Sequence, residues 1–186
     1  MKQLSNETVD RLIRMLTHAV SAETFRDALN HVRSIPLKDN KVELTACDGH
    51  MLSQVIVEDE ALFSAGESYM HRDQLPFLKI IKKQWKHGAP AESIKGSLKV
   101  EGKELLNQDK IKYPNIDQIK PKFDGTFEIG LNADLLLSLA ETLKGAKLPI
   151  VHLVFKDSVS PIKVFSGESE GCLMPVRITQ KLSKNA

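Results

Sequence analysis

The segment Thr45-Ala46-Cys47-Asp48-Gly49-His50-Met51-Leu52 joins two apolar runs, Lys41 to Cys47 and Met51 to Glu58. An Asp-Gly pair between apolar runs is a strong signal for a β-hairpin, because glycine readily adopts the positive φ that a tight turn requires. The segment therefore predicts two antiparallel strands joined at Asp48 and Gly49.

The elements predicted around this hairpin recur along the chain. A helix capped by Ser5 and ending near Val20 precedes it, because apolar side chains there repeat at helical spacing. A strand from Phe25 to Leu37 completes the first group. The second group has a strand from Ser68 to His71, a helix from Gln74 to about His87 capped by Asp73, strands near Ile94, at Leu98 to Val100 and at Lys103 to Asp109, and then a loop from Tyr113 to Pro121. The third group has a strand from Thr126 to Gly130, a helix from Ala133 to Leu143 between an Asn132 cap and Gly145, and strands at Ile150 to Phe155, Ile162 to Phe165 and Cys172 to Thr179.

This order predicts an α+β fold made of three successive β-α-β-β-β units, with a period of about 60 residues. The first unit lacks a clear leading strand. The repeat is one of element order and not of sequence identity.

The composition is that of an ordinary globular protein. The chain has 186 residues, of which 41% are hydrophobic and 27% charged. No apolar run approaches the roughly 18 residues of a membrane span, and the N-terminal residues lack the apolar core of a signal peptide. We therefore expect a cytoplasmic protein.

The residues that carry chemistry in enzymes form no recognisable constellation. Cys47 and Cys172 lie in no Cys-x-x-Cys pair, and no phosphate-binding loop or metal-ligand spacing is present. Cys47 and His50 suggest a nucleophile and a base, but neighbouring positions on a strand and its turn point in different directions. We therefore predict neither catalysis nor a metal nor a cofactor, and keep a Cys47–His50 hydrolase as the weakest hypothesis.

Positive charge gathers on the second predicted helix, although the net charge of the chain is only +2. Lys79, Lys82, Lys83 and Lys86 follow the spacing i, i+3, i+4 and i+7 and span about 100° of the helix. The stripe alone favours a solvated helix face, and the alternative interpretation is a track for DNA phosphates.

The flanking helices differ from this one. Arg11 and Arg14 lie opposite the apolar face of the first helix and favour the DNA interpretation. The third helix presents Asp134, Ser138 and Glu141 on its polar face and does not.

Six segments, in order, resemble the bacterial sliding clamp, the beta subunit of DNA polymerase III. The hairpin segment at Thr45 resembles the family's T-A-T-D-G-H-R-L. The other five are Ala28 to Asn30, Tyr113 to Pro121, Phe127 to Asn132, Asp157 to Pro161, and Leu173 to Ile178 with its M-P-M-R-L-like end.

The resemblance implies a shortened DNA-clamp fold. Residues 1–122 resemble the complete middle domain of the clamp, and residues 123–186 resemble the second half of its last domain. It also implies a non-enzymatic protein that encircles double-stranded DNA without regard to its sequence. Clamps of this family form rings of six domains with twelve helices inside. Three helices per chain therefore predict a homotetramer.

Two sets of site residues follow from the resemblance and the charge pattern. The expected DNA-facing residues are Arg11, Arg14, Lys79, Lys82, Lys83 and Lys86. A groove for short peptides of DNA polymerases and clamp loaders is implied at Leu29, Cys47, Gly49, His50, Met51, Leu52, Pro114, Gln118, Ile119, Val159, Pro161, Leu173, Met174, Pro175, Val176 and Arg177.

The implied groove departs from the family pattern at Met51 and Gln118, which replace arginines, and at Asp117, where a further arginine is usual. We therefore expect a less basic groove with altered peptide preference. The alternative function is a regulator that keeps the groove, forms no closed ring and competes for clamp-binding peptides.

Overall fold

In the computed structural model the chain divides into two compact units, unit 1 (Met1–Ile119) and unit 2 (Lys120–Ala186). Residues 2–21, 27–107, 111–119, 129–143 and 150–176 are described here. The unit boundary lies three residues before the boundary expected from sequence, and both fall beside or among residues outside this description. Each unit is treated separately.

Unit 1 contains two of the predicted β-α-β-β-β units. Its elements are β1 (Lys2–Leu4), α1 (Asn6–His18), a 3-10 turn (Asp27–Asn30), β2 (His31–Pro36), β3 (Lys41–Cys47), β4 (Leu52–Glu58), α2 (Glu60–Ala65), β5 (Ser68–His71), a 3-10 turn (Arg72–Gln74), α3 (Leu75–Gln84), β6 (Ala89–Ile94), β7 (Ser97–Val100), β8 (Lys103–Leu106) and α4 (Ile116–Ile119).

The two halves of unit 1 exchange their leading strands. β5, which leads the second half, completes a four-stranded sheet of order β4-β3-β2-β5 with the strands of the first half. β1, which leads the first half, completes the sheet β1-β6-β7-β8 with the strands of the second half. All of these pairings are antiparallel. Neither sheet is therefore complete without a strand from the other half.

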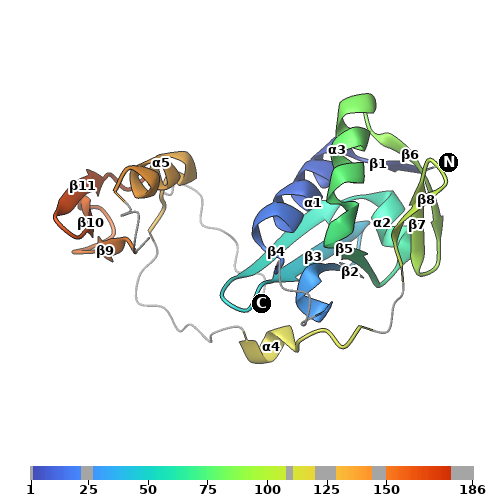
Figure 1. Ribbon diagram of the computed structural model, residues 1–186, viewed down its shortest axis with the longest axis horizontal. Helices are drawn as coiled ribbons and strands as arrows, with labels where there is room; N and C mark the ends of the chain where they lie inside the picture. The colour runs from blue at the N-terminus through green and yellow to red at the C-terminus, as the bar shows by residue number, and fades with distance from the viewer. Residues whose placement is uncertain (1, 22–26, 108–110, 120–128, 144–149, 177–186) are drawn as a thin grey trace. The chain divides into compact units, whose positions relative to one another are not determined.

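The core lies between the sheets and the helix pair α1 and α3, which lie side by side (Figure 1). Leu12 of α1, Leu78 and Ile81 of α3, and Leu44 and Leu98 of the sheets are completely buried. Full burial of such side chains contributes about 1.5–3 kcal/mol each. This packing fixes which helix faces remain in water.

Several boundaries predicted from sequence are confirmed. β3 spans Lys41–Cys47 as predicted, and β4 starts one residue later than predicted, at Leu52. Ser5 caps α1 by accepting a hydrogen bond from the Thr8 N–H (3.1 Å), and Asn132 caps α5 (Ala133–Leu143) in the same way.

Other predictions for unit 1 are wrong. The first half does have a leading strand, β1, which holds one buried apolar residue, Leu4, and pairs with a distant partner. Residues 27–30 form a 3-10 turn and not a strand. α3 begins at Leu75 with Gln74 as its N-cap and has no side-chain cap, whereas the side chain of His71 caps the preceding 3-10 turn.

The ends of unit 1 also differ from expectation. α3 ends at Gln84, three residues before the predicted end at His87. Helix α2 was not predicted, and neither was the single turn α4 within the expected loop.

Unit 2 contains the third β-α-β-β-β unit. Its described elements are α5, β9 (His152–Val154), β10 (Ile162–Ser166) and β11 (Ser169–Leu173), and its sheet has the order β11-β10-β9. The bounds of the predicted strand Cys172 to Thr179 are wrong. β11 begins at Ser169 and ends at Leu173, before Pro175, which has no N–H to donate. The predicted helix stop at Gly145 and most of the leading strand lie outside the described residues.

Asp59 joins the start of α2 to the segment between β1 and α1. Its carboxylate is buried and accepts hydrogen bonds from the N–H groups of Ala61 and Leu62 at the start of α2. The other carboxylate oxygen accepts from the Ser5 N–H at 2.9 Å, just after β1. One side chain therefore caps α2 and fixes the entry to α1.

Replacing Asp59 by alanine should lower the free energy of unfolding by about 2 kcal/mol, because two buried N–H groups and one part-buried N–H group lose their acceptor. Asp59→Asn keeps one acceptor oxygen and should cost about half as much. Urea denaturation of the full chain measures both. Equal stability of the wild type and Asp59→Ala would contradict this role.

Candidate functional site

A basic surface lies on the outer side of the α1–α3 pair. The helices run antiparallel, since Asn6 at the start of α1 donates to the backbone oxygen of Lys86, just beyond the end of α3. All six side chains expected to face DNA are exposed; these are Arg11, Arg14, Lys79, Lys82, Lys83 and Lys86. The structure thus gathers charges from two helices on one side of the domain.

The six charges are not equally available to a ligand. Lys82 forms an ion pair with Asp10 of α1, with 2.6 Å between Nζ and Oδ1. Arg11 lies 3.8 Å from Glu7, one turn away on the same helix. Among the described residues, no carboxylate lies within ion-pair distance of Arg14, Lys79 or Lys83. These three are therefore the strongest candidates for contacts with phosphate.

Lys86 does not belong to the helical stripe. α3 ends at Gln84 with Trp85 as its C-cap, so only three of the four lysines share the helix. The spacing from Lys79 to Lys86 predicted a longer helix than forms. In unit 2, α5 carries exposed Asp134, Ser138 and Glu141 at the positions where α1 carries Glu7, Arg11 and Arg14.

Part of the expected peptide groove gathers at one end of the sheet β4-β3-β2. Cys47, the last residue of β3, pairs with Leu52, the first residue of β4. Between them, the carboxylate of Asp48 accepts hydrogen bonds from the N–H groups of His50 (2.8 Å) and Met51 (2.7 Å). These bonds lower the pKa of Asp48 and hold the turn with Met51 44% exposed.

Tyr113 attaches the segment that carries Pro114 and Gln118 to this end of the sheet. Its hydroxyl donates toward the backbone oxygens of Thr45 (3.0 Å) and, more weakly, His31 (3.4 Å). Burial raises the pKa of the Tyr113 phenol, and the nearby Cys47 adds to the effect. Sequence analysis did not single out Tyr113 by itself, although it opens one of the six segments.

The residues of the expected groove that lie in unit 1 differ in their exposure to solvent. Leu29 and Cys47 are buried, Leu52 and Pro114 are half-buried, and Gly49, His50 and Gln118 are exposed. Ile119 is the last residue of α4. Gly49 has φ 95°, which favours glycine at this turn.

In unit 2, the expected groove residues lie around the β9–β10 connection and after β11. The Asp157 carboxylate accepts hydrogen bonds from the N–H groups of Val159 (2.9 Å) and Ser160 (2.6 Å) and from the Ser160 hydroxyl, which lowers its pKa. This turn presents Val159 72% exposed. Pro161, Met174 and Val176 are also exposed, Pro175 is half-buried, Leu173 is buried, and Arg177 lies outside the described residues.

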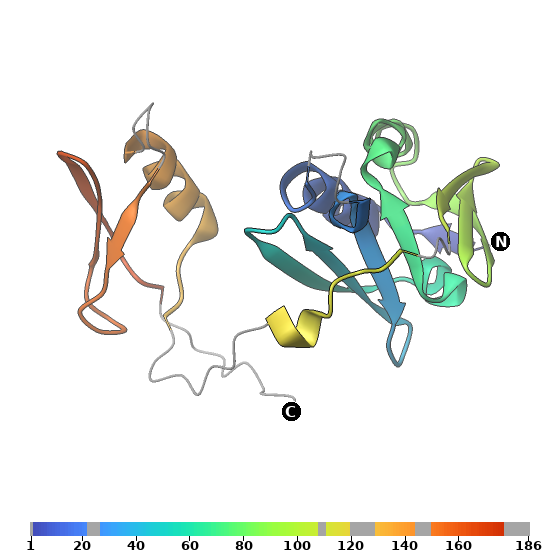
Figure 2. The same cartoon turned by 60° about the horizontal axis from the view of Figure 1, so that its bottom comes forward.

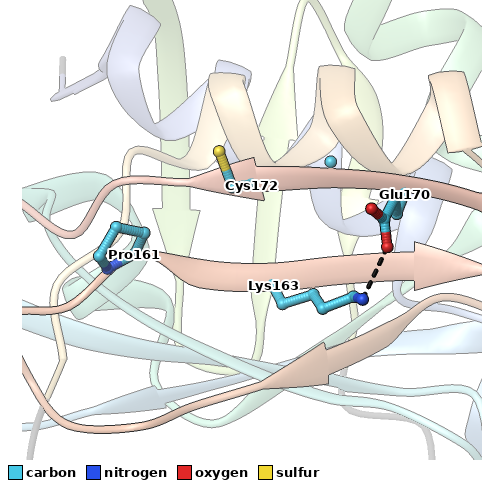
Figure 3. A pocket seen from close by; sticks show the side chains of 5 residues that line it. Pro161, Lys163, Glu170 and Cys172 are labelled. Atoms are coloured by element: carbon cyan, nitrogen blue, oxygen red, sulfur yellow. Dashed lines mark ion pairs between the residues drawn. The ribbon is translucent and has the colours of Figure 1, made fainter.

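A shallow cavity of about 420 Å³ lies on the face of the unit 2 sheet opposite α5. It is lined by Pro161, Lys163, Glu170, Gly171 and Cys172. An ion pair of 2.6 Å joins Lys163 to Glu170 across β10 and β11 (Figure 3) and lowers the pKa of Glu170. Among the described residues, Pro161 is the one that lines this cavity and also belongs to the expected groove.

Two of the histidines that are scattered in sequence come together in unit 1. The rings of His31 and His71 have centroids 4.7 Å apart, and Asp27 lies beside them. His31 Nδ1 lies 2.7 Å from the Asp27 backbone oxygen, and His71 Nδ1 accepts from the Asp73 N–H. Both Nδ1 atoms therefore serve local turns, and the pairing of β2 with β5 accounts for the proximity.

The hydrolase hypothesis gains no support from this geometry. Cys47 is buried at a strand end, and His50 is exposed in the adjacent turn. Among the described residues, no hydrogen bond joins the two. No helix in the described part of the chain is long and apolar enough to cross a membrane.

Comparison with known proteins identifies the fold. No protein-family model matches the sequence, and neither does any curated protein. The structure is similar to the C. crescentus beta sliding clamp (TM-score 0.72, 15% identity) and to the DNA polymerase sliding clamp of Bacillus subtilis (TM-score 0.71, 19% identity). Both matches cover 94% of this chain but only 50% and 48% of those chains.

A third similar structure is the sliding clamp of Bartonella birtlesii bound to griselimycin, with a TM-score of 0.51 and 16% identity over 94% of this chain and 65% of that one. At these identities the similarity shows the fold alone. The chain has the DNA-clamp fold expected from the six segments, and it spans about half the length of the first two clamps.

The buried Tyr113 hydroxyl predicts a loss of stability in alkali. Its pKa is raised in the folded state, so above the unfolded value of about 10 the unfolded chain releases a proton that the folded chain retains. The free energy of unfolding should therefore fall as pH rises above about 10, by up to about 1.4 kcal/mol per pH unit for this group.

Tyr113→Phe should remove this part of the pH dependence and cost about 1 kcal/mol at neutral pH through the lost hydrogen bond. Urea unfolding of both proteins between pH 8 and pH 11 is the measurement. Tyr69, whose pKa is also raised by burial, leaves a residual slope in both. An identical dependence of unfolding free energy on pH in the two proteins would contradict a raised pKa of the Tyr113 phenol.

Proposed function

We propose that this protein is a DNA sliding clamp, a processivity factor that encircles duplex DNA and holds partner proteins on it. The observation that carries the proposal is the basic surface on α1 and α3, on a domain with the clamp fold. Fold similarity alone does not establish function, so the charge on this particular helix pair is the deciding feature.

The chemistry of the basic surface suits a sliding contact. Arg14, Lys79 and Lys83 are exposed on rigid helices, and phosphate contacts made by such side chains carry no sequence information. Binding of this kind weakens steeply with salt, because each phosphate contact releases counterions. A ring tolerates weak contacts, since its closure and not its affinity retains it on DNA.

The proposed partner surface has two parts. In unit 1 it comprises the turn at Met51 and the segment attached by Tyr113; in unit 2 it comprises Val159 and Met174. Exposed methionine suits recognition of varied apolar peptides, because its flexible side chain adapts to different shapes. The occupants that we propose are short peptides of DNA polymerases and clamp loaders.

The proposed ring is a homotetramer with three of its helices from each chain. A chain that binds peptides but forms no ring would act as a competitor for clamp-binding peptides. Retention on circular DNA separates the two functions, because only a closed ring depends on the topology of the DNA.

The wild-type protein assembled on a nicked circular plasmid should stay with the DNA during gel filtration and be released when the plasmid is linearised. The triple variant Arg14→Glu, Lys79→Glu and Lys83→Glu should dissociate from the circle about tenfold faster or more, because three phosphate contacts become repulsive.

The matched control is the triple variant Lys38→Glu, Lys41→Glu and Lys95→Glu. It changes the net charge equally at exposed positions in or directly beside the turns of the sheets. This control should be retained like the wild type. Equal lifetimes on circular and linear DNA would contradict a ring, and equal loss from both triple variants would contradict the assignment to α1 and α3.

The partner surface can be tested with griselimycin, the compound bound to the Bartonella birtlesii clamp. We expect the chain to bind griselimycin in titration calorimetry, and Met174→Asp to weaken binding about tenfold or more, because an apolar contact becomes charged. Leu37→Asp, at a similarly exposed leucine on the β2–β3 turn, should bind as the wild type does. Unchanged binding by Met174→Asp would exclude this groove.

A further inference from the structure

Unit 2 is a half domain, and unit 1 is a complete domain of the same type. Unit 2 can therefore be compared position by position with one half of unit 1. α1 starts after the Ser5 cap and α5 starts after the Asn132 cap. The three strands that follow α5 form a sheet in chain order, as β2, β3 and β4 do in unit 1. Unit 1 therefore shows what covers each surface of such a half domain.

The leading strand supplies the first correspondence. In unit 1, Tyr69 of β5 bridges Asn107, just after the last strand of its own half, and β5 pairs with β2 of the other half on its opposite side. In unit 2, Gly130 bridges Val176, just after β11, with 2.8 Å from the Val176 nitrogen to the Gly130 oxygen. Unit 2 therefore repeats the bridge between the leading segment and the end of the last strand. Within its described residues, the pairing of β5 with β2 has no counterpart.

The edge strand supplies the second correspondence. β9 holds the position of β2 and β6, which receive the exchanged strands β5 and β1. Leu153 of β9 pairs with the fully buried Val164 yet is 39% exposed. The core-facing residues Val32 of β2 and Ala91 of β6 are 1% and 2% exposed. Among the described residues of unit 2, no strand covers the edge of β9 that corresponds to the edge of β2 covered by β5 in unit 1.

The helix supplies the third correspondence. Asp10, five residues after the N-cap of α1, lies on the face that packs against α3, where it pairs with Lys82. The residue five after the N-cap of α5 is Leu137, which is 64% exposed. A leucine thus occupies the position that meets the second helix in a complete domain. Within the described residues of unit 2, α5 is the single helix (Figure 2).

We propose that the half domains of two copies of this chain complete each other, each packing α5 against its counterpart and covering the edge of β9 in the other. The occupant is a second copy because the exposed surfaces, a helix face and a strand edge, are the ones that a half domain of the same β-α-β-β-β type covers in unit 1. Exposed edges and apolar helix faces of this kind are liabilities unless they are covered. The proposal concerns assembly and does not depend on DNA binding.

The test compares Leu137→Asp with Ser138→Asp in the full chain. Leu137 faces the proposed partner, whereas Ser138 holds the position of the exposed Arg11 in α1. Leu137 is exposed in the single chain, so aspartate there should not prevent folding, which circular dichroism checks. Light scattering measures native mass over a hundredfold dilution series.

The wild type should show an even number of 20.8 kDa chains, Leu137→Asp should have half the wild-type mass, and Ser138→Asp should match the wild type. A wild type that is monomeric throughout would overturn the proposal, as would equal masses for all three proteins or dissociation of both variants.

Hydrogen exchange on the wild type provides a measurement that needs no variant. The amides of His152–Val154 should exchange more slowly in the assembled protein than after dilution, because the strand gains a second hydrogen-bonded neighbour. Protection of these amides that does not change with concentration would overturn the proposal that a second copy covers the edge of β9.

Discussion

The exchange of leading strands between neighbouring β-α-β-β-β units is the constraint on which the rest of this structure depends. β1 belongs in sequence to the first half of unit 1 but pairs with β6 of the second half, and β5 does the reverse. Each sheet is thus closed by a strand whose own helix packs with the other helix over the shared core. A half domain can fold its helix onto its own sheet, as unit 2 does with α5 and Leu173, but the described residues of unit 2 leave a strand edge and a helix face uncovered.

The same constraint determines where charge can lie. α1 and α3 bury Leu12, Leu78 and Ile81 against the sheets and contact each other along one side, so only their outer faces reach water. Asp10 and Lys82 are placed at the contact and partly neutralise each other. Within the described residues, the unpaired positive charge on the two helices is therefore on Arg14, Lys79 and Lys83, with Lys86 just beyond the end of α3.

Much of this fold could be predicted from local sequence signals. The Asp-Gly turn and its flanking runs located β3 and β4, and side-chain caps located the starts of α1 and α5. The resemblance to sliding clamps added the domain type. What could not be predicted depends on distant partners: β1 has only three residues and becomes a strand by pairing with β6. The attachment made by Tyr113 likewise depends on backbone oxygens more than 65 residues away. The groove is still harder to predict from sequence, because its expected residues are divided between the two units.

Completion of half domains in pairs would also restrict the stoichiometry of any ring. Two chains that share one completed domain contribute three domains, so an assembly in which every edge is covered contains an even number of chains. A ring of six domains, the size implied by the resemblance, then requires four chains. The contact between the two halves would be symmetric, since each half presents the same helix face and the same strand edge to the other. The second contact needed to close such a ring would have to be made between the remaining surfaces of unit 1, where β4 is an edge strand and Ile56 is 61% exposed. Closure of the ring and completion of the half domain are therefore separate physical problems, solved at different surfaces of the chain.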